Sequence, residues 1–518
     1  MDEGENINSR GSGGLKKLLR PISRTIEYIA SFLKHYLPHF LHQTKLTTRP
    51  AVEAFGNIRR YRHTDYGLII SSAAVGIIIG IFVVIFHLTM EYAEVLFKQL
   101  DINVHSVIPV QHILFVLIPA LGGLGIGLLQ KTWFRGATVQ SLHTVVNALV
   151  NREGRINPVN SLKSIIYAAL SISSGGGAGR EGPTIALGAS LGSSFAQITR
   201  LRPQQLRVLC GAGAAAAISG IFNAPLGAIV FALEGMIGET SIRTFVPLVI
   251  SSVLATATTR LFMGNTPLLI TPALESVSLP DYFLLALAGI LSGFVAIYFL
   301  KMYESTEKLT KNRLKKIPEV FRPAIGGLAA GIMLLMLPTM WETTYSPINH
   351  VIAGEGMPIT KNSIFEYLVP LFTPETMIFL FMLVAAATVI VKPISNAVTL
   401  GSGGAGGTMA PVIKVGAMFG FCFGAMIQFL FPESSPGLYA IVCAGALLAG
   451  TFQVPMTGAI VLFEICHNYD LILPLIFASV IASFIVQKSG VKTFNPLQAG
   501  IVDDDEKLHP KLLARGNE

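Results

Sequence analysis

Long apolar stretches that recur from Tyr66 to about Val486 constrain the fold of this chain more than any other feature. Each is near or beyond the ~18–20 residues that a membrane-spanning helix needs. Backbone exposed to lipid has to satisfy its own hydrogen bonds, so unbroken helix is the rule there. We therefore predict an all-α polytopic membrane protein with on the order of a dozen hydrophobic segments. The clearest segments are Gly67–Met90, Ile113–Leu129, Leu206–Met236, Phe283–Leu300, Met377–Val391, Met409–Phe431, Tyr439–Phe463 and Leu471–Val486.

The composition agrees with a membrane protein and excludes an ordinary soluble domain. Hydrophobic residues make up 52% of the chain and charged residues 13%, against roughly 45–50% and ~25% in soluble domains. The net charge is +8, and the positive excess sits in the first 65 residues. Because cytoplasmic segments of membrane proteins collect Lys and Arg, this excess places the N-terminus in the cytoplasm and argues against nucleic-acid binding.

These patterns divide the chain into three parts. Residues 1–64 are predicted to be a basic cytoplasmic region, in which apolar residues at helical spacing over Leu15–Leu37 indicate an amphipathic helix on the membrane surface. A solvated tail without structure is the alternative for that region. Residues 65–498 are predicted to be the transmembrane domain, and residues 499–518 a short cytoplasmic tail. We therefore expect a multi-pass protein in contact with membrane lipid, with both termini in the cytoplasm.

Two motifs occur twice in the same order, which predicts repeat halves at about 65–262 and 280–498. The copies of each motif are displaced by about 230 residues. Such repeats in transporters commonly have inverted topology, with the substrate site near the midplane of the membrane. The first motif is GGAGREGPTIALGASLG at Gly176–Gly192 and GGAGGTMAPVIKVGAMFG at Gly403–Gly420, with glycines five and nine residues after a proline. The second is NAPLGAIVFALE at Asn223–Glu234 and QVPMTGAIVLFE at Gln453–Glu464, with proline third and glutamate twelfth.

Each motif copy is typical of a loop that opens a helix, because glycine lets the backbone bend and proline is favoured in the first helical turn. The predicted helix starts lie near Glu181, Asn223, Gly407 and Val454. A helix start presents unsatisfied N–H groups and the positive end of the helix dipole, which attract anions. Several starts that point inward at membrane depth would hold a small anion weakly enough to let it leave, as conduction requires.

Glu181 is a carboxylate at one of these starts, between Gly179 and Gly182. An ionisable residue at membrane depth is costly and indicates function. We predict that Glu181 gates the anion route by occupying the anion's site, and that protonation or competition from the anion drives it out. The alternative is a helix cap that the dipole stabilises. We expect the neighbouring Arg180 to pack and hydrogen-bond to loop carbonyls in preference to touching the ion.

The segments GREGP (Gly179–Pro183), GGTMAP (Gly406–Pro411) and HNYDLILP (His467–Pro474) resemble the CLC family of chloride channels and chloride/proton antiporters. The resemblance runs in order over about Tyr66–Leu497 and is to prokaryotic-type members without C-terminal CBS domains. It implies the CLC fold with tilted, broken helices, a homodimer with one pore in each subunit, and Glu181 as the gating glutamate. It also implies chloride or similar small anions as substrate, protons as a second ion in coupled members, and a bacterial inner membrane.

Several positions depart from the family pattern. The segment GATVQ puts Ala137 where the family has a serine, Met409 replaces a phenylalanine, and Phe494 stands where a tyrosine hydroxyl closes the inner side. Main-chain N–H groups of Thr408 and Met409 are still able to serve the ion. We therefore expect an inner anion site that is weaker or less selective for chloride. The predicted anion-binding residues are Ala137, Thr138, Gly179, Arg180, Gly182, Gly407, Thr408, Met409 and Phe494.

The proton route of coupled members also lacks a residue here. Those members resemble FxxEEM, in which the second glutamate takes protons from the cytoplasm. This chain has FALEGM, with Glu234 at the first glutamate and Gly235 in place of the second. The main prediction is therefore a voltage-gated-type chloride channel that conducts passively. The alternative is a chloride/proton antiporter with a non-standard internal proton path, and an inverted-repeat transporter of another solute is a remote third reading.

The remaining polar residues carry weaker predictions. Lys414 is expected either to snorkel or pair with a carboxylate, or to add positive potential to the anion route. Glu464 is expected to end a helix near water. The histidines, including His143 and His467, and the four cysteines show no metal-ligand spacing, so we expect no metal and no cofactor apart from bound chloride. An enzyme with a nucleotide loop is rejected, since no strand precedes GGAGREG and no Walker lysine is present.

Overall fold

The computed structural model describes residues 64–105, 113–132, 141–238, 241–271, 279–341, 345–354, 359, 363–373, 376–495 and 497. The predictions for the amphipathic helix, for Ala137 and Thr138 and for the C-terminal tail lie outside these residues. Two compact units are separated at Gly67 and Leu68, and the description below concerns the second, Leu68–Glu518.

The fold is built from helices. In the part of the chain that the structure describes, extended backbone pairs at one isolated β-bridge. The first half contains α3 (Asp65–His105), α4 (Ile113–Thr132), α5 (Leu142–Asn151), α6 (Pro158–Ser173), α7 (Glu181–Ile198), α8 (Pro203–Phe222), α9 (Pro225–Ala232), the π-helical turn η1 (Leu233–Ile237) and α10 (Ile242–Met263). The second half contains α11 (Leu279–Leu314), α12 (Arg322–Met336), η2 (Pro338–Met340), α13 (Ser346–Ile352), η3 (Ile364–Leu371), α15 (Met377–Gly401), α16 (Met409–Leu430), α17 (Pro436–Phe452), α18 (Pro455–Cys466), η4 (Tyr469–Leu471) and α19 (Ile472–Ser489).

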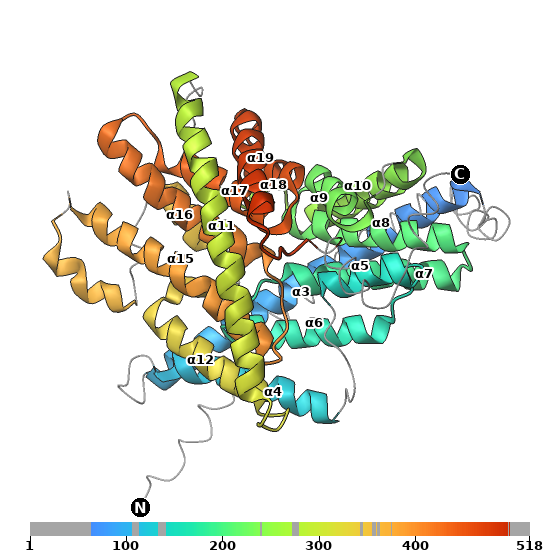
Figure 1. Ribbon diagram of the computed structural model, residues 1–518. Coiled ribbons are helices and arrows are strands. Elements are labelled where there is room, and N and C mark those ends of the chain that lie inside the picture. The colour runs from blue at the N-terminus through green and yellow to red at the C-terminus, as the bar shows by residue number, and fades with distance from the viewer. Residues whose placement is uncertain are drawn as a thin grey trace, which may run out of the picture. The chain divides into compact units, whose positions relative to one another are not determined.

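The helix order of the first half returns in the second, as the repeated motifs predict. The pair α7 and α8 corresponds to α16 and α17, and in each pair the two helices pack closely together. The short helices α9 and α18 also correspond, and they pack against each other across the halves. Figure 1 shows α11 crossing α15 and α17, with which it is in contact. The predicted all-α fold with two repeats is confirmed.

The helices differ in length in the way that broken helices require. Among the described residues, seven helices are long and apolar enough to span a membrane, and five more apolar helices are shorter. The short ones include α9, α17 and α18, which follow or precede the glycine and proline breaks of the repeats. Their ends therefore fall within the protein, where packed neighbours can satisfy the backbone that a break exposes.

The glycines five and nine residues after each proline are the contact points between neighbouring helices. A methyl group at Gly188 of α7 would collide with the carbonyl oxygen of Gly213 of α8. A methyl group at Gly416 of α16 would lie 2.5 Å from Cα of Ala444 and 2.7 Å from the carbonyl oxygen of Cys443, both in α17. Membrane helices associate mainly by close packing, because lipid gives no hydrophobic drive between them. These glycines therefore hold the paired helices in place.

A Gly416→Ala substitution should destabilise the protein relative to Gly125→Ala. Both residues lie inside helices, so alanine improves the intrinsic helix propensity of both by ~1 kcal/mol. Only Gly416 meets the backbone of another helix, whereas the nearest atom to a methyl group at Gly125 is Leu170 Cδ1 at 3.8 Å. We expect a difference of about 1–3 kcal/mol, as found for overpacked cores. Melting temperatures of the two variants in detergent measure it, and equal values would contradict the packing role.

Candidate anion pathway

The two glycine loops of the repeats pair with each other in the buried interior of the protein. The Gly179 N–H donates to the Gly407 carbonyl at 2.9 Å, and the Gly407 N–H donates to the Gly179 carbonyl at 2.5 Å. The bridge is antiparallel. The buried Asn396 amide joins it by donating to the carbonyls of Gly177 at 3.3 Å and Gly407 at 3.2 Å. This pairing brings the starts of α7 and α16 together, although they are far apart in the sequence.

The glutamates that end the second motif cap each other's helices. The Glu464 carboxylate accepts from the N–H groups of Leu226 at 3.1 Å and Gly227 at 2.7 Å, in the first turn of α9. The Glu234 carboxylate accepts from the N–H of Thr457 at 2.9 Å and from its hydroxyl at 2.7 Å, in the first turn of α18. This reciprocal capping, like the glycine bridge, is the arrangement expected of two repeats with inverted topology.

Two of the four predicted anion-accepting helix starts are therefore closed. The starts of α9 and α18 already hold carboxylates of the protein itself, so the prediction is wrong for the starts near Asn223 and Val454. The starts of α7 and α16 remain. Glu464 does not simply end a helix near water, because it is half-buried and bound to α9. Sequence spacing placed both glutamates at helix ends but could not show that each points at the other repeat.

Glu181 is fully buried at the first residue of α7. Its Oε1 atom lies 3.4 Å from the hydroxyl of Tyr345, which donates to it. Its other oxygen lies so close to the Cα of Gly179 that a methyl group there would collide with it. The carboxylate thus turns back over the glycine loop, beside the bridge to α16. A larger residue than glycine at position 179 would leave it no room.

The Arg180 side chain contacts two rings, those of His87 and Tyr345. Its Nη1 atom lies 3.1 Å from His87 Nδ1, and its guanidinium carbon lies 5.7 Å from the centre of the Tyr345 ring. The side chain is buried. The predicted hydrogen bonds to loop carbonyls are replaced by these ring contacts. Arg180 therefore contacts Tyr345, the same residue that donates to Glu181, and no motif in the sequence indicated that link.

A cavity of about 580 Å³ reaches the helix starts from the other side. Five of the predicted anion-binding residues line it, and they come from α7, α16 with the loop before it, and the segment after α19. Polar and charged side chains from α5, α11 and that last segment also line it. We call this cavity the vestibule. The five residues are Gly182, Gly407, Thr408, Met409 and Phe494.

Glu181 does not line the vestibule, whereas the next residue, Gly182, does. The Glu181 carboxylate therefore lies at the start of α7 but outside the lining of the vestibule. Of the other predicted residues, Gly179 takes part in the bridge and Arg180 faces His87. The structure thus brings together most of the predicted set around the starts of α7 and α16.

Phe494 sits in an aromatic cluster at the vestibule wall. Its ring centre lies 5.0 Å from that of Tyr303, 5.5 Å from Phe452 and 6.1 Å from Phe299. Its N–H donates to the Thr451 carbonyl at 2.9 Å, which fixes the backbone. Tyr303 of α11 lines the same cavity and carries the hydroxyl that Phe494 lacks. Nothing in its local sequence marks it, because α11 is a long helix without a motif.

Two buried lysines hold the turn that follows α12. Lys414 Nζ donates to the carbonyls of Thr339 at 3.0 Å and Trp341 at 3.3 Å, and Lys392 Nζ donates to the carbonyl of Met340 at 2.9 Å. Both side chains are essentially without solvent exposure, so the prediction that Lys414 snorkels is wrong. Since Tyr345 follows this turn, the lysines help to fix the segment that contacts Glu181.

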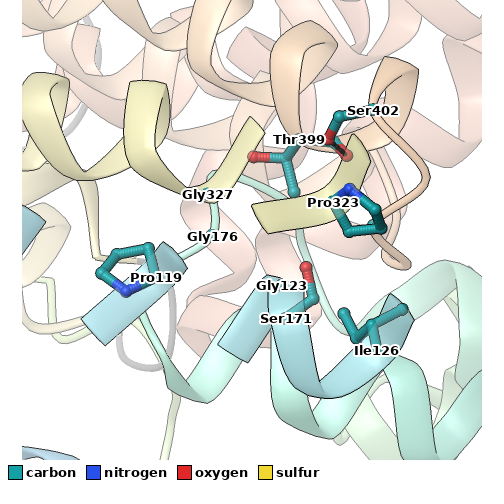
Figure 2. Close-up of a pocket in the computed structure, with 10 residues that line it drawn as sticks. Pro119, Gly123, Ile126, Ser171, Gly176, Pro323, Gly327, Thr399 and Ser402 are labelled. Carbon is teal, nitrogen blue, oxygen red and sulfur yellow. Dashed lines mark hydrogen bonds between the residues drawn. The ribbon is translucent and has the colours of Figure 1, made fainter. Parts of the chain in front are cut away.

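A second, much smaller cavity lies behind the glycine loops (Figure 2). Its volume is about 10 Å³, which is room for about one water molecule. Ser171 and Thr399 contribute hydroxyl groups to its wall, and the Thr399 hydroxyl accepts from the Gly177 N–H at 3.0 Å. This cavity is too small for a hydrated anion. The vestibule is therefore the better candidate for the anion route.

Metal binding finds no support in the described part of the chain. No group of three or more His, Cys, Asp or Glu residues there is placed to hold a metal ion. The four cysteines are free thiols, three of them buried. His143 and His467 are exposed, and His143 lines the vestibule. The site is therefore built from helix ends, one buried carboxylate and aromatic rings.

Comparison with known proteins agrees with this geometry. A family model described as "Voltage gated chloride channel" matches residues 122–487. The chain belongs to the CLC family. It is a multi-pass transport protein of that family and not an enzyme.

Similar proteins include both kinds of CLC member. The chain is 28% identical to "H(+)/Cl(-) exchange transporter ClcA" of Vibrio campbellii over 441 residues, which are 82% of this chain and 88% of the relative. It is 28% identical to "Voltage-gated ClC-type chloride channel ClcB" of Escherichia coli O17:K52:H18 over 376 residues, 71% of this chain and 83% of the relative. The solved structure of a slow cyanobacterial Cl-/H+ antiporter matches 84% of this chain and 97% of its own, with a TM-score of 0.69 and 21% identity. The CLC fold is therefore confirmed.

Removing the Glu234 carboxylate should loosen the contact between the halves. Glu234→Ala leaves the first turn of α18 without its cap, at a cost of about 1–2 kcal/mol. Glu319→Ala is the control, because the Glu319 side chain is 83% exposed and lies 3.8 Å from Arg322 in a surface ion pair. We expect a lower melting temperature for the first variant only. Equal melting temperatures would show that the reciprocal caps contribute nothing.

Proposed function

We propose that this CLC protein exchanges chloride for protons across a membrane, with Glu181 as the gate. The observation that carries the proposal is the antiparallel bridge between Gly179 and Gly407. It sets two helix starts side by side, with a buried carboxylate at one side and an open vestibule at the other. A small anion that enters the vestibule meets these helix starts before it meets the gate.

The helix starts supply the attraction for the anion. Each helix leaves its first N–H groups without partners inside the helix and carries the positive end of its dipole there. Gly182, Thr408 and Met409 lie at the starts of α7 and α16 and line the vestibule. Attraction from partial charges in place of a full cationic side chain keeps binding weak enough for release.

Glu181 fits a gate because its carboxylate and the anion carry the same charge. A buried carboxylate beside two helix starts competes with chloride for the same electrostatic position. When the carboxylate takes up a proton it loses that attraction and leaves the position to the anion. Because the same carboxylate either binds a proton or occupies the anion's site, it couples the movement of protons to the movement of anions. This link is the basis of exchange, and a passive channel would lack it.

Passive conduction is the second candidate. One observation favours it, and another favours exchange. Gly235 replaces the glutamate that takes protons in coupled members, which favours a channel. The Vibrio relative named as an exchange transporter aligns with 82% of the chain, and the E. coli relative named as a channel with 71%. The relative named as an exchange transporter aligns with more of the chain, which supports exchange more than conduction. Glu234 is bound to the start of α18, so a proton route would need another carboxylate.

We also propose that the vestibule opens to the cytoplasm. The end of α11 that lines it is rich in lysine and continues into the basic segment at 311–316. Lys and Arg collect on the cytoplasmic side of membrane proteins. The same side is proposed for both termini, and the bacterial relatives support a location in the bacterial cell membrane. A homodimer with one pore in each subunit remains our proposal from the family resemblance.

Reconstitution tests the exchange directly. Liposomes that contain the wild-type protein should move protons against their gradient when a chloride gradient is imposed, as recorded with paired chloride and pH electrodes. Glu181→Gln should abolish this proton movement and make chloride flux independent of pH, whereas wild-type chloride flux should rise as pH falls. Protein-free liposomes are the control. Chloride flux without proton movement in the wild type would favour the passive channel instead.

Phe494→Tyr should strengthen chloride binding at the inner site. A hydroxyl that donates to an anion contributes ~1.5 kcal/mol, which is about tenfold in affinity. Phe494→Leu is the matched control, since it changes the ring but adds no donor. Calorimetric titration of chloride into detergent-solubilised protein measures both. A Tyr variant with unchanged affinity would show that position 494 is too far from the anion.

A further inference from the structure

Two glutamates line the vestibule, which is the proposed cytoplasmic entrance for protons. Glu304 and Glu307 of α11 both line the cavity whose wall includes Gly182 and Met409. Their side chains are 39% and 26% exposed, respectively. The carboxylate at Glu234 is bound to the start of α18, and Gly235 has no side chain to offer. In the described residues, α11 is therefore the source of carboxylates on the vestibule wall.

The two glutamates of α11 have one feature in common and one that separates them. Each is paired with a lysine four residues later: Glu304 with Lys308 at 2.6 Å, and Glu307 with Lys311 at 3.0 Å. Only Glu307 also has Tyr303 one turn before it on the same helix, and both side chains line the vestibule. Glu307 is thus the less exposed carboxylate and the one that lies a helical turn from a tyrosine of the interior.

Tyr303 connects Glu307 with the inner anion site. Its ring is nearly buried, with 9% exposure, and packs edge to face against Phe494 at 5.0 Å. Tyr303, Phe494 and Met409 all line the vestibule. The hydroxyl that is missing at Phe494 is therefore present on the neighbouring ring of Tyr303, one helical turn from the more exposed Glu307.

We infer that Glu307 is the proton acceptor on the vestibule side, and that Tyr303 positions it and passes its proton inward. This inference rests on the proposed exchange function. A proton from water in the vestibule binds a carboxylate oxygen of Glu307. The Tyr303 oxygen then accepts this proton while its own hydroxyl proton passes to water at the inner end of the vestibule, and from there to the carboxylate of Glu181. Glu307 returns to its carboxylate form, and no other bond changes.

The charges around Glu307 suit a group that takes up and releases protons. Lys311 and Lys308 on the same helix carry the opposite charge to Glu307, and Glu304 carries the same charge. His143 of α5 and Lys492 of the last segment face the same cavity. Protonation of Glu307 leaves the nearby lysine charges less compensated. The same event therefore favours entry of an anion into the vestibule.

Coupling ratios of matched variants test the inference in reconstituted full-length protein. Glu307→Gln should lower the number of protons moved per chloride at least tenfold, while chloride still flows down its gradient. Glu304→Gln removes a carboxylate from the same helix and cavity, and it should retain the wild-type ratio. Glu307→Asp should restore much of the ratio, and Tyr303→Phe should reduce it. A change confined to folding would lower both fluxes together and leave the ratio unchanged.

Each outcome decides a definite point. A coupled wild type with a Glu307→Gln variant of unchanged ratio overturns the role of Glu307 and leaves the proposed function standing. Loss of coupling in Glu304→Gln with retention in Glu307→Gln assigns the proton to the other carboxylate and likewise overturns the inference. A wild type that moves no protons overturns the exchange function, and the role of Glu307 falls with it.

Discussion

Two main-chain hydrogen bonds between Gly179 and Gly407 hold the arrangement on which the rest of this structure depends. They join the loops that open α7 and α16, so two helix ends that begin in different halves of the chain face one region. Main-chain pairing at membrane depth is tolerated only where protein surrounds it, and here Asn396 and the packed glycines surround it. Without this bridge, the carboxylate of Glu181 would have no second helix start beside it.

Carboxylates have two different roles in this fold, and their surroundings distinguish the roles. Glu234 and Glu464 each accept two main-chain N–H groups from the opposite repeat, so they are part of the framework. Glu181 is buried beside a glycine loop and receives a longer bond, of 3.4 Å, from a tyrosine hydroxyl. A carboxylate that accepts two main-chain N–H groups is fixed in position by them. The Tyr345 contact of Glu181 is longer than the bonds of Glu234 and Glu464, which suits the movement that we propose for a gate.

The fold and much of the site could be predicted because both depend on local chemistry. Apolar length fixed the spanning helices, and the Gly and Pro spacing located the starts of α7, α9, α16 and α18 within about two residues. The role of Lys414 could not be predicted, because its partners are the carbonyls of Thr339 and Trp341 in a distant turn. The contact between Tyr303 and Phe494 could not be predicted from the sequence either. Helix α11 has no motif, and it meets the last segment only in the folded chain.

The sequence alone determined that this chain is a helical membrane protein of two repeats with a lone acid at a helix start. Those properties follow from hydrophobic length, helix-breaking residues and their order along the chain. Which helix starts remain open to an anion depends on how the two halves pack together. Both motifs predicted the same dipole at all four starts, but the glutamates of the second motif reach across the pseudo-symmetric interface and occupy two of them. Which N–H group a carboxylate meets is set by the packing of α9 on α18, and no spacing along one segment contains that information.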